Sequence, residues 1–144
     1  MIFRSITLQE ANVFLPILKE HFSRIQTLVA EGQLIHSKIA VQGEQVDTSG
    51  QSYPPEEAKS LKSGLESIED HIRSEILEMQ QYGAIVKSVF PARLDFLSER
   101  HKQLIYLCWQ SGDENVCYWH PVEEGFGTRR YIEMPNEFGS EVIH

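Results

Sequence analysis

TLQEANVFLPILKEHFSRIQTLVAEGQLIHSKIA, residues 7–40, decides the fold of this chain. It opens on a capping box, in which the Thr7 hydroxyl accepts from the backbone N–H of Glu10 and the Glu10 carboxylate accepts from the N–H of Thr7. Apolar residues then recur at alternating intervals of three and four, as in a coiled-coil seam: Leu8, Ala11, Leu15, Leu18, Phe22, Ile25, Val29 and on to Ile39. The spacing predicts one long helix from about Leu8 to about Ala40, which needs a partner along its length.

Pro16 interrupts this seam. Because it has no N–H for the carbonyl of Asn12 and its ring crowds that turn, we expect a bend between the two residues. Two interpretations are open. The bend could serve only to wrap the helix around the core, or the freed carbonyl and the side chain of Asn12 could contact another segment.

A second helix is predicted to begin at Pro54 and to stop at Gly83, which is free to take the left-handed conformation. Its apolar stripe runs from Ala58 to Met79, and its acidic residues form a solvated face. The polar, glycine-containing segment 42–53 joins the two helices. Residues 1–83 are therefore expected to form a long antiparallel helical hairpin.

From Ala84 onward the pattern changes to short β-branched and aromatic runs. Strands are predicted at 84–89, 93–97, 104–109 and 116–120, the last two joined as a hairpin through 111–115. Cys108 and Cys117 face each other if Trp109 pairs with Val116, and lie on opposite faces if Trp109 pairs with Cys117. The polar tail, 134–144, is expected to fray.

The predicted fold class is α+β: a long, coiled-coil-like antiparallel two-helix hairpin packed on a small antiparallel sheet. We expect residues 1–144 to form a single domain, with the helical hairpin over 1–83 and the β element over 84–133. A hairpin this long leaves part of its apolar seam uncovered. We therefore expect self-association, with a two-fold dimer as the default.

Composition excludes several classes of function. Thirteen Lys and Arg against 21 Asp and Glu give a net charge of −8, which argues against nucleic-acid binding and against attachment to anionic lipid. No apolar run is long enough to span a membrane, and the N-terminus lacks the apolar core of a signal peptide. Two cysteines are too few for a disulfide scaffold or a four-cysteine zinc site. A cytoplasmic location is the simplest expectation.

Several motifs resemble those of an uncharacterised bacterial family, domain-of-unknown-function family 2203. They are Thr7-Leu8, Glu10-Ala11-Asn12, Leu15-Pro16, Asp95-Phe96, Leu107-Cys108-Trp109, Gly112-Asp113, Tyr118-Trp119-His120, Gly125-Phe126 and Arg129. The resemblance covers roughly residues 6–132. It departs from the family where a glycine before Asp95-Phe96 is replaced by Ala92 or Arg93, and where Gly-Glu-Pro is replaced by Gly112-Asp113-Glu114. The resemblance implies a helical hairpin with a small β element, and it supplies no established activity.

The candidate binding residues combine carboxylates, an imidazole, a guanidinium and two indoles: Asp95, Trp109, Asp113, Trp119, His120 and Arg129. In a catalytic interpretation, His120 is a general base oriented by Asp95, and Arg129 holds an anionic substrate. In a metal interpretation, His120 acts with Glu123 or Glu124 and with Asp95 or Cys108.

Two non-chemical interpretations stand beside these. In the first, the cluster only stabilises the fold: Asp95 pairs with Arg129, the indoles cover the base of the hairpin, and His120 hydrogen-bonds a backbone carbonyl. In the second, the aromatic hairpin is a contact surface for another protein. A cysteine within an apolar strand, whether Cys108 or Cys117, is more typical of an inert core residue than of a nucleophile.

We favour a non-enzymatic interaction or scaffolding module with a possible protein partner. The alternative is a protein or enzyme that binds a metal or a small molecule around Asp95, His120 and Arg129. No catalytic residue is assigned, and the sequence identifies no cofactor. The open candidates for metal ligation are His120, Glu123 and Glu124.

Overall fold

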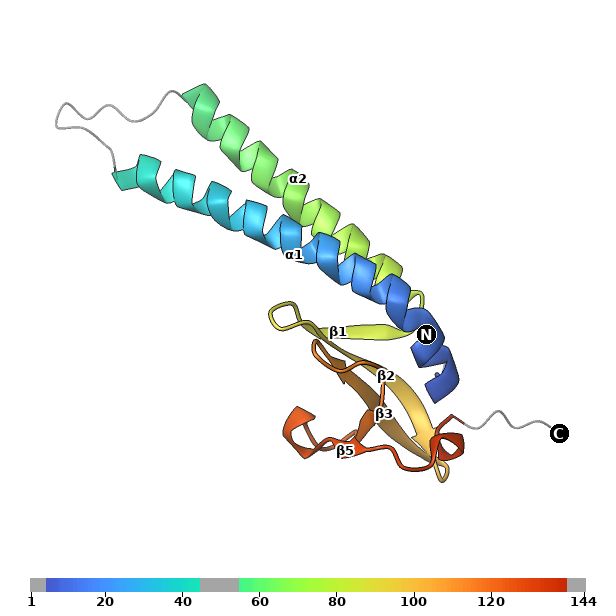
Figure 1. Ribbon diagram of the computed structural model, residues 1–144. Helices are drawn as coiled ribbons and strands as arrows, with labels where there is room; N and C mark the ends of the chain where they lie inside the picture. The colour runs from blue at the N-terminus through green and yellow to red at the C-terminus, as the bar shows by residue number, and fades with distance from the viewer. Residues whose placement is uncertain (1–4, 45–54, 140–144) are drawn as a thin grey trace. The chain divides into compact units, whose positions relative to one another are not determined.

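Residues 5–44 and 55–139 are described by a computed structural model (Figure 1). The chain divides into two compact units, one of Met1–Phe22 with Ile76–His144 and the other of Ser23–Glu75. The first unit contains the sheet together with the beginning of one helix and the end of the other. The second unit is purely helical. The single-domain organisation stays a prediction.

Helix α1 spans Leu8–Glu44 and helix α2 spans Pro55–Gln80. Within the helical unit they run side by side and antiparallel (Figure 1), which confirms the predicted hairpin. The helices approach closely at Gly32, where an added Cβ would lie 3.7 Å from the side chains of Leu65 and Ile68. Arg24 Nε also donates to the Glu75 carboxylate at 2.7 Å.

The ends of the helices differ slightly from the prediction. Helix α1 continues to Glu44, so the first three residues of the expected connection 42–53 are helical. The rest of that connection, and Pro54, lie outside the described residues. Gly83 follows α2 with φ +82°, which confirms its role as the stop.

The start of α1 is fixed by two sets of side-chain hydrogen bonds. The capping box is confirmed, because Thr7 N–H donates to Glu10 Oε1 and Glu10 N–H donates to Thr7 Oγ1, each at 3.0 Å. Pro16 lies inside the helix. The Asn12 side chain accepts from the N–H of Val116 at 2.7 Å and donates to the carbonyl of Val116 at 3.1 Å. The interpretation that the Asn12 side chain contacts another segment is therefore correct.

The sheet has five antiparallel strands in sequence order. They are β1 (Ala84–Ser88), β2 (Arg93–Arg100), β3 (Gln103–Gln110), β4 (Tyr118–Pro121) and β5 (Arg130–Tyr131). The four predicted strands are confirmed, although β2 is longer and β4 begins two residues later than expected. Asn12 takes both backbone groups of Val116, which explains why that residue does not join the ladder. The short strand β5 was not predicted.

The register of the sheet separates two faces. Asp95 lies opposite Cys108, Cys108 opposite Tyr118, and Tyr106 opposite His120, so these side chains share one face. The other face carries the buried apolar residues Leu94, Phe96, Leu107 and Trp109. Trp109 contacts Phe22 of α1, with ring centroids 6.0 Å apart. Extending this register pairs Trp109 with Cys117, so Cys108 and Cys117 lie on opposite faces.

The expectation that the tail frays is wrong for residues 134–139. A short 3-10 helix spans Pro135–Glu137, and Phe138 is buried with its ring 5.6 Å from that of Trp119. The Gly139 N–H donates to the carbonyl of Glu99 at 2.7 Å. The aromatic ring of Phe138 supplies the apolar contact that a purely polar tail would lack. Residues 140–144 lie outside the described part of the chain.

Neither described helix is long and apolar enough to cross a membrane.

Replacing Asn12 with Ala should lower the free energy of unfolding by about 1–3 kcal/mol, because it leaves the N–H and carbonyl of buried Val116 without their partner. Urea denaturation followed by circular dichroism measures this. Gln9→Ala is the matched control, since Gln9 is exposed on the same turn. Equal denaturation midpoints for the two variants would show that the contact contributes nothing.

Candidate functional site

Three buried side chains with metal-binding atoms meet on the face of the sheet opposite the apolar core. Asp95 from β2, Cys108 from β3 and His120 from β4 are 3%, 1% and 4% exposed. One ligand atom from each lies within 4.8 Å of the other two. Antiparallel pairing brings them together, since Asp95 is directly opposite Cys108 and His120 follows two residues after the partner of Cys108.

The hydrogen bonds of His120 determine what must lie between its ring and Asp95. Its Nδ1 is 2.9 Å from the carbonyl oxygen of Pro121, which can only accept, so Nδ1 carries a proton. Its Nε2 is 3.3 Å from Asp95 Oδ2. If the ring is neutral, Nε2 presents a lone pair to the carboxylate. The contact then requires a proton between the two atoms, on the ring or on the carboxyl group, or a metal ion.

The distance is longer than is usual for a hydrogen bond to a carboxylate and suits a pair of metal ligands. A charge-assisted N–H···O bond to a carboxylate is normally about 2.7–2.9 Å long. Nitrogen and oxygen ligands bound about 2.0–2.1 Å from a tetrahedral Zn²⁺ lie roughly 3.3–3.4 Å apart. The observed 3.3 Å matches the edge of such a tetrahedron.

Cys108 is not arranged as a nucleophile. Burial, followed by the nearby charge and hydrogen bond of Asp95, raises the pKa of its thiol from 9.0 to about 12. A nucleophilic cysteine needs the opposite effect, a lowered pKa beside a base. Metal coordination instead deprotonates a thiol outright. The surroundings of Cys108 therefore disfavour covalent catalysis, and only a bound cation would favour its thiolate.

Arg129 belongs to a second group beside these three residues. Its Nη1 donates to Asp113 Oδ2 at 2.7 Å, and its guanidinium lies 4.0 Å from the ring centroid of Tyr118. Asp113 is itself held by the backbone N–H of Gln110 at 3.0 Å. The expected ion pair between Asp95 and Arg129 is therefore not formed. The guanidinium pairs instead with Asp113, which lies in the turn after β3.

The two indoles contribute structure. Trp109 is buried against Phe22 and donates its Nε1–H to the carbonyl of Asp113 at 2.9 Å. Trp119 is also buried, and the guanidinium carbons of Arg100 and Arg130 lie 4.7 and 5.0 Å from its ring centroid. Both rings are covered by the protein itself. Neither lies on the face that carries Asp95.

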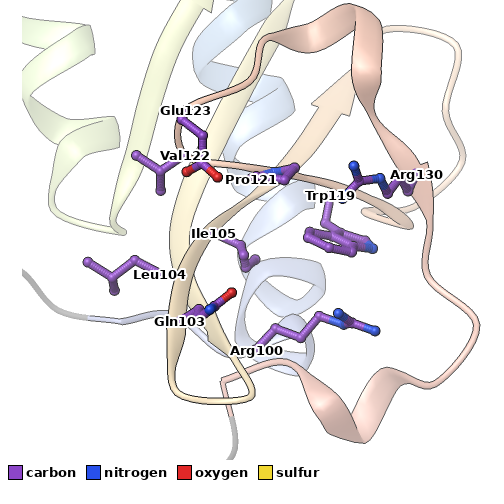
Figure 2. Close-up of a pocket in the computed structure, with 9 residues that line it drawn as sticks. All are labelled: Arg100, Gln103, Leu104, Ile105, Trp119, Pro121, Val122, Glu123 and Arg130. Carbon is purple, nitrogen blue, oxygen red and sulfur yellow. The ribbon is translucent and has the colours of Figure 1, made fainter.

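Figure 2 shows a different pocket, which contains Trp119 and Glu123. It has a volume of about 550 Å³, with Ile105 and Pro121 among its apolar lining and Arg100 and Arg130 on either side of the indole (Figure 2). Both guanidinium groups are engaged, Arg100 with Glu137 at 3.1 Å and Arg130 with Glu124 at 3.2 Å. The charges around the pocket are thus largely compensated.

Apart from Trp109, which is buried against Phe22, the predicted binding residues separate into three places. Asp95 and His120 meet at the candidate metal site, Asp113 and Arg129 pair beside it, and Trp119 and Glu123 line the pocket of Figure 2. Glu123 and Glu124 do not join His120 within the described residues. Cys108, which the sequence analysis left as one option, is the third member of the candidate group. The sequence alone could not place Cys108 beside His120, because that placement depends on the register of the hairpin.

Alkylation should distinguish the two thiols. At a pKa of about 12, the thiolate fraction of Cys108 at pH 8 is on the order of a thousandfold lower than at a pKa of 9.0. In native, metal-free Cys117→Ser protein, we expect iodoacetamide to leave Cys108 almost unmodified at pH 8. In urea it should react fully. Cys108→Ser protein serves as the comparison, because Cys117 is only partly buried. Mass spectrometry follows the alkylation. If the two thiols are alkylated at similar rates in the native proteins, the buried environment described for Cys108 is wrong.

Comparison with known proteins supplies a family but no activity. No curated protein and no solved structure matches the chain. The profile of the family described as "Uncharacterized conserved protein (DUF2203)" matches residues 4–132. Since this match covers most of the chain, the protein belongs to the uncharacterised family DUF2203.

Proposed function

We propose that this protein binds a divalent transition metal ion, Zn²⁺ in the first instance, through the Asp95 carboxylate, the Cys108 thiolate and Nε2 of His120. The observation that supports this most is the orientation of His120. Its Nδ1–H is committed to a backbone carbonyl while Nε2 faces a carboxylate oxygen at 3.3 Å. Metal-bound histidines characteristically donate their other ring N–H to a carbonyl or carboxylate.

Charge balance supports the same assignment. One carboxylate and one thiolate neutralise a divalent cation, so the buried centre carries no net charge. Sulfur, imidazole and carboxylate together are a donor set that suits Zn²⁺ or Fe²⁺ better than Mg²⁺ or Ca²⁺. Arg129 stays charged beside Cys108, since Asp113 raises its pKa against the lowering effect of burial.

Three protein ligands leave a fourth position for water or another ligand, as in catalytic zinc sites. A metal there would act as a Lewis acid or lower the pKa of a bound water. This favours the alternative function of the sequence analysis, a metal protein or enzyme, over scaffolding by the aromatic hairpin. The burial of Trp109 and Trp119 supports that preference, because neither ring is free to act as an interface anchor.

Purified tag-free protein, loaded with Zn²⁺ and then dialysed, should retain about one zinc atom per chain. Asp95→Asn, Cys108→Ser and His120→Ala should each lose at least about tenfold in affinity, since each removes a ligand. Elemental analysis gives the stoichiometry, and competition with a chelator gives the affinity.

Glu123→Gln and Glu124→Gln are matched controls, because both carboxylates lie close in sequence but outside the three-residue group. They should bind zinc as the unmodified protein does. A protein that retains no zinc after loading contradicts the proposed function. So does zinc retention by Cys108→Ser and His120→Ala that equals retention by the unmodified protein.

An interaction role is a second candidate, supported by exposed apolar residues on the helical unit. Leu34 and Val41 of α1 are 65% and 47% exposed. We propose that this helical surface forms a homodimer in the cytoplasm, whose reducing conditions suit the two free cysteines.

Light scattering at micromolar concentration should then give twice the monomer mass of 16.6 kDa. Leu34→Glu should return the mass to that of the monomer, because a charge would be buried in the interface. Glu31→Gln, at an exposed position on the same helix, is the control. A monomeric mass for the unmodified protein would contradict the dimer.

A further inference from the structure

Arg93, at the start of β2, is an arginine without a counter-ion. The other arginines of the described residues each pair with a carboxylate: Arg24, Arg73, Arg100, Arg129 and Arg130. Within those same residues, Arg93 has no such partner, and its enclosed Nε has no hydrogen-bond acceptor. In a chain of net charge −8, carboxylates outnumber basic groups, so an arginine without a carboxylate partner is unexpected. A guanidinium with an unpartnered donor and no carboxylate requires an explanation, and an acceptor supplied from outside the chain is one.

The register places Arg93 beside the candidate metal site. Arg93 precedes Asp95 by two residues on β2, so both side chains leave the same face of the sheet. Its partner across the ladder is Gln110, and the next pair on that face is Asp95 with Cys108. Arg93 is therefore one row away from two of the proposed metal ligands.

A ring contact joins Arg93 to Arg129. The guanidinium of Arg93 lies 4.3 Å from the ring centroid of Phe126, and that of Arg129 lies 4.6 Å from the same centroid. Arg129 also interacts electrostatically with Cys108. Phe126 thus holds two guanidinium groups at the edge of the site, and Asp113 compensates only one of them.

We propose that Arg93 binds the oxyanion group of a ligand, a carboxylate or a phosphate, that lies beside the metal. A planar guanidinium with free N–H groups forms two parallel hydrogen bonds to such a group. The fourth metal position could take another atom of the same ligand. The proposal deepens the proposed function and rests on it for the ligand's relation to the metal. The anion site itself depends only on Arg93.

The test measures anion binding to chelator-treated and to zinc-loaded protein, with inorganic phosphate and succinate as probes. Calorimetry in a buffer without oxyanions gives the dissociation constant. Arg93→Gln replaces the guanidinium with a neutral polar amide. Arg73→Gln is the matched control, because Arg73 is exposed and pairs with Asp70 on α2. The anion that binds more tightly shows whether phosphate or carboxylate is the natural group.

We expect at least one probe to bind saturably to the chelator-treated protein, at least tenfold more weakly to Arg93→Gln, and unchanged to Arg73→Gln. Arg93→Gln should still retain one zinc atom per chain. If neither probe binds the unmodified protein, or if Arg93→Gln binds as well as Arg73→Gln, the anion site is refuted. Zinc retention without anion binding would refute this inference alone. Anion binding without zinc retention would refute the proposed function and leave the Arg93 site standing.

Discussion

The contact between His120 and Asp95 determines what the buried face of the sheet can bind. A buried carboxylate needs a positive charge or hydrogen-bond donors, and the imidazole facing Asp95 has already committed one ring N–H to the Pro121 carbonyl. A proton or a metal ion between Nε2 and Oδ2 would supply that charge. The thiol of Cys108, enclosed beside the same carboxylate, offers a third ligand atom that a metal would use and a proton would not, which is why we propose a metal.

The sheet makes this contact possible by register. Three consecutive antiparallel strands each contribute one side chain to one face, while the alternate residues fill the apolar core on the other. A slip of one residue would exchange the two faces and place the polar groups in the core. The Asn12 side chain helps to define the beginning of β4, since it captures both backbone groups of Val116. In this way the first turns of α1 help to position the strand that carries His120.

Local patterns in the sequence predicted the local structure well. The capping box, the helical seam, the Gly83 stop and four strands follow from spacing and from the chemistry of single residues. The sequence was less informative where the outcome depended on pairing between distant segments. Arg129 pairs with Asp113 and not with Asp95, and Phe138 packs against Trp119 through its aromatic ring. Cys108, and neither Glu123 nor Glu124, lies with Asp95 and His120 in the candidate group. Arg93 was not singled out, although its position two residues before Asp95 places it on the same strand face.

X-ray absorption at the zinc edge of the zinc-loaded protein identifies the atoms bound to the metal. We expect one sulfur at about 2.3 Å together with nitrogen and oxygen ligands at about 2.0–2.2 Å. The sulfur contribution should disappear in Cys108→Ser and persist in Cys117→Ser. A first shell of nitrogen and oxygen alone in the unmodified protein would contradict the assignment of Asp95, Cys108 and His120 as a metal site.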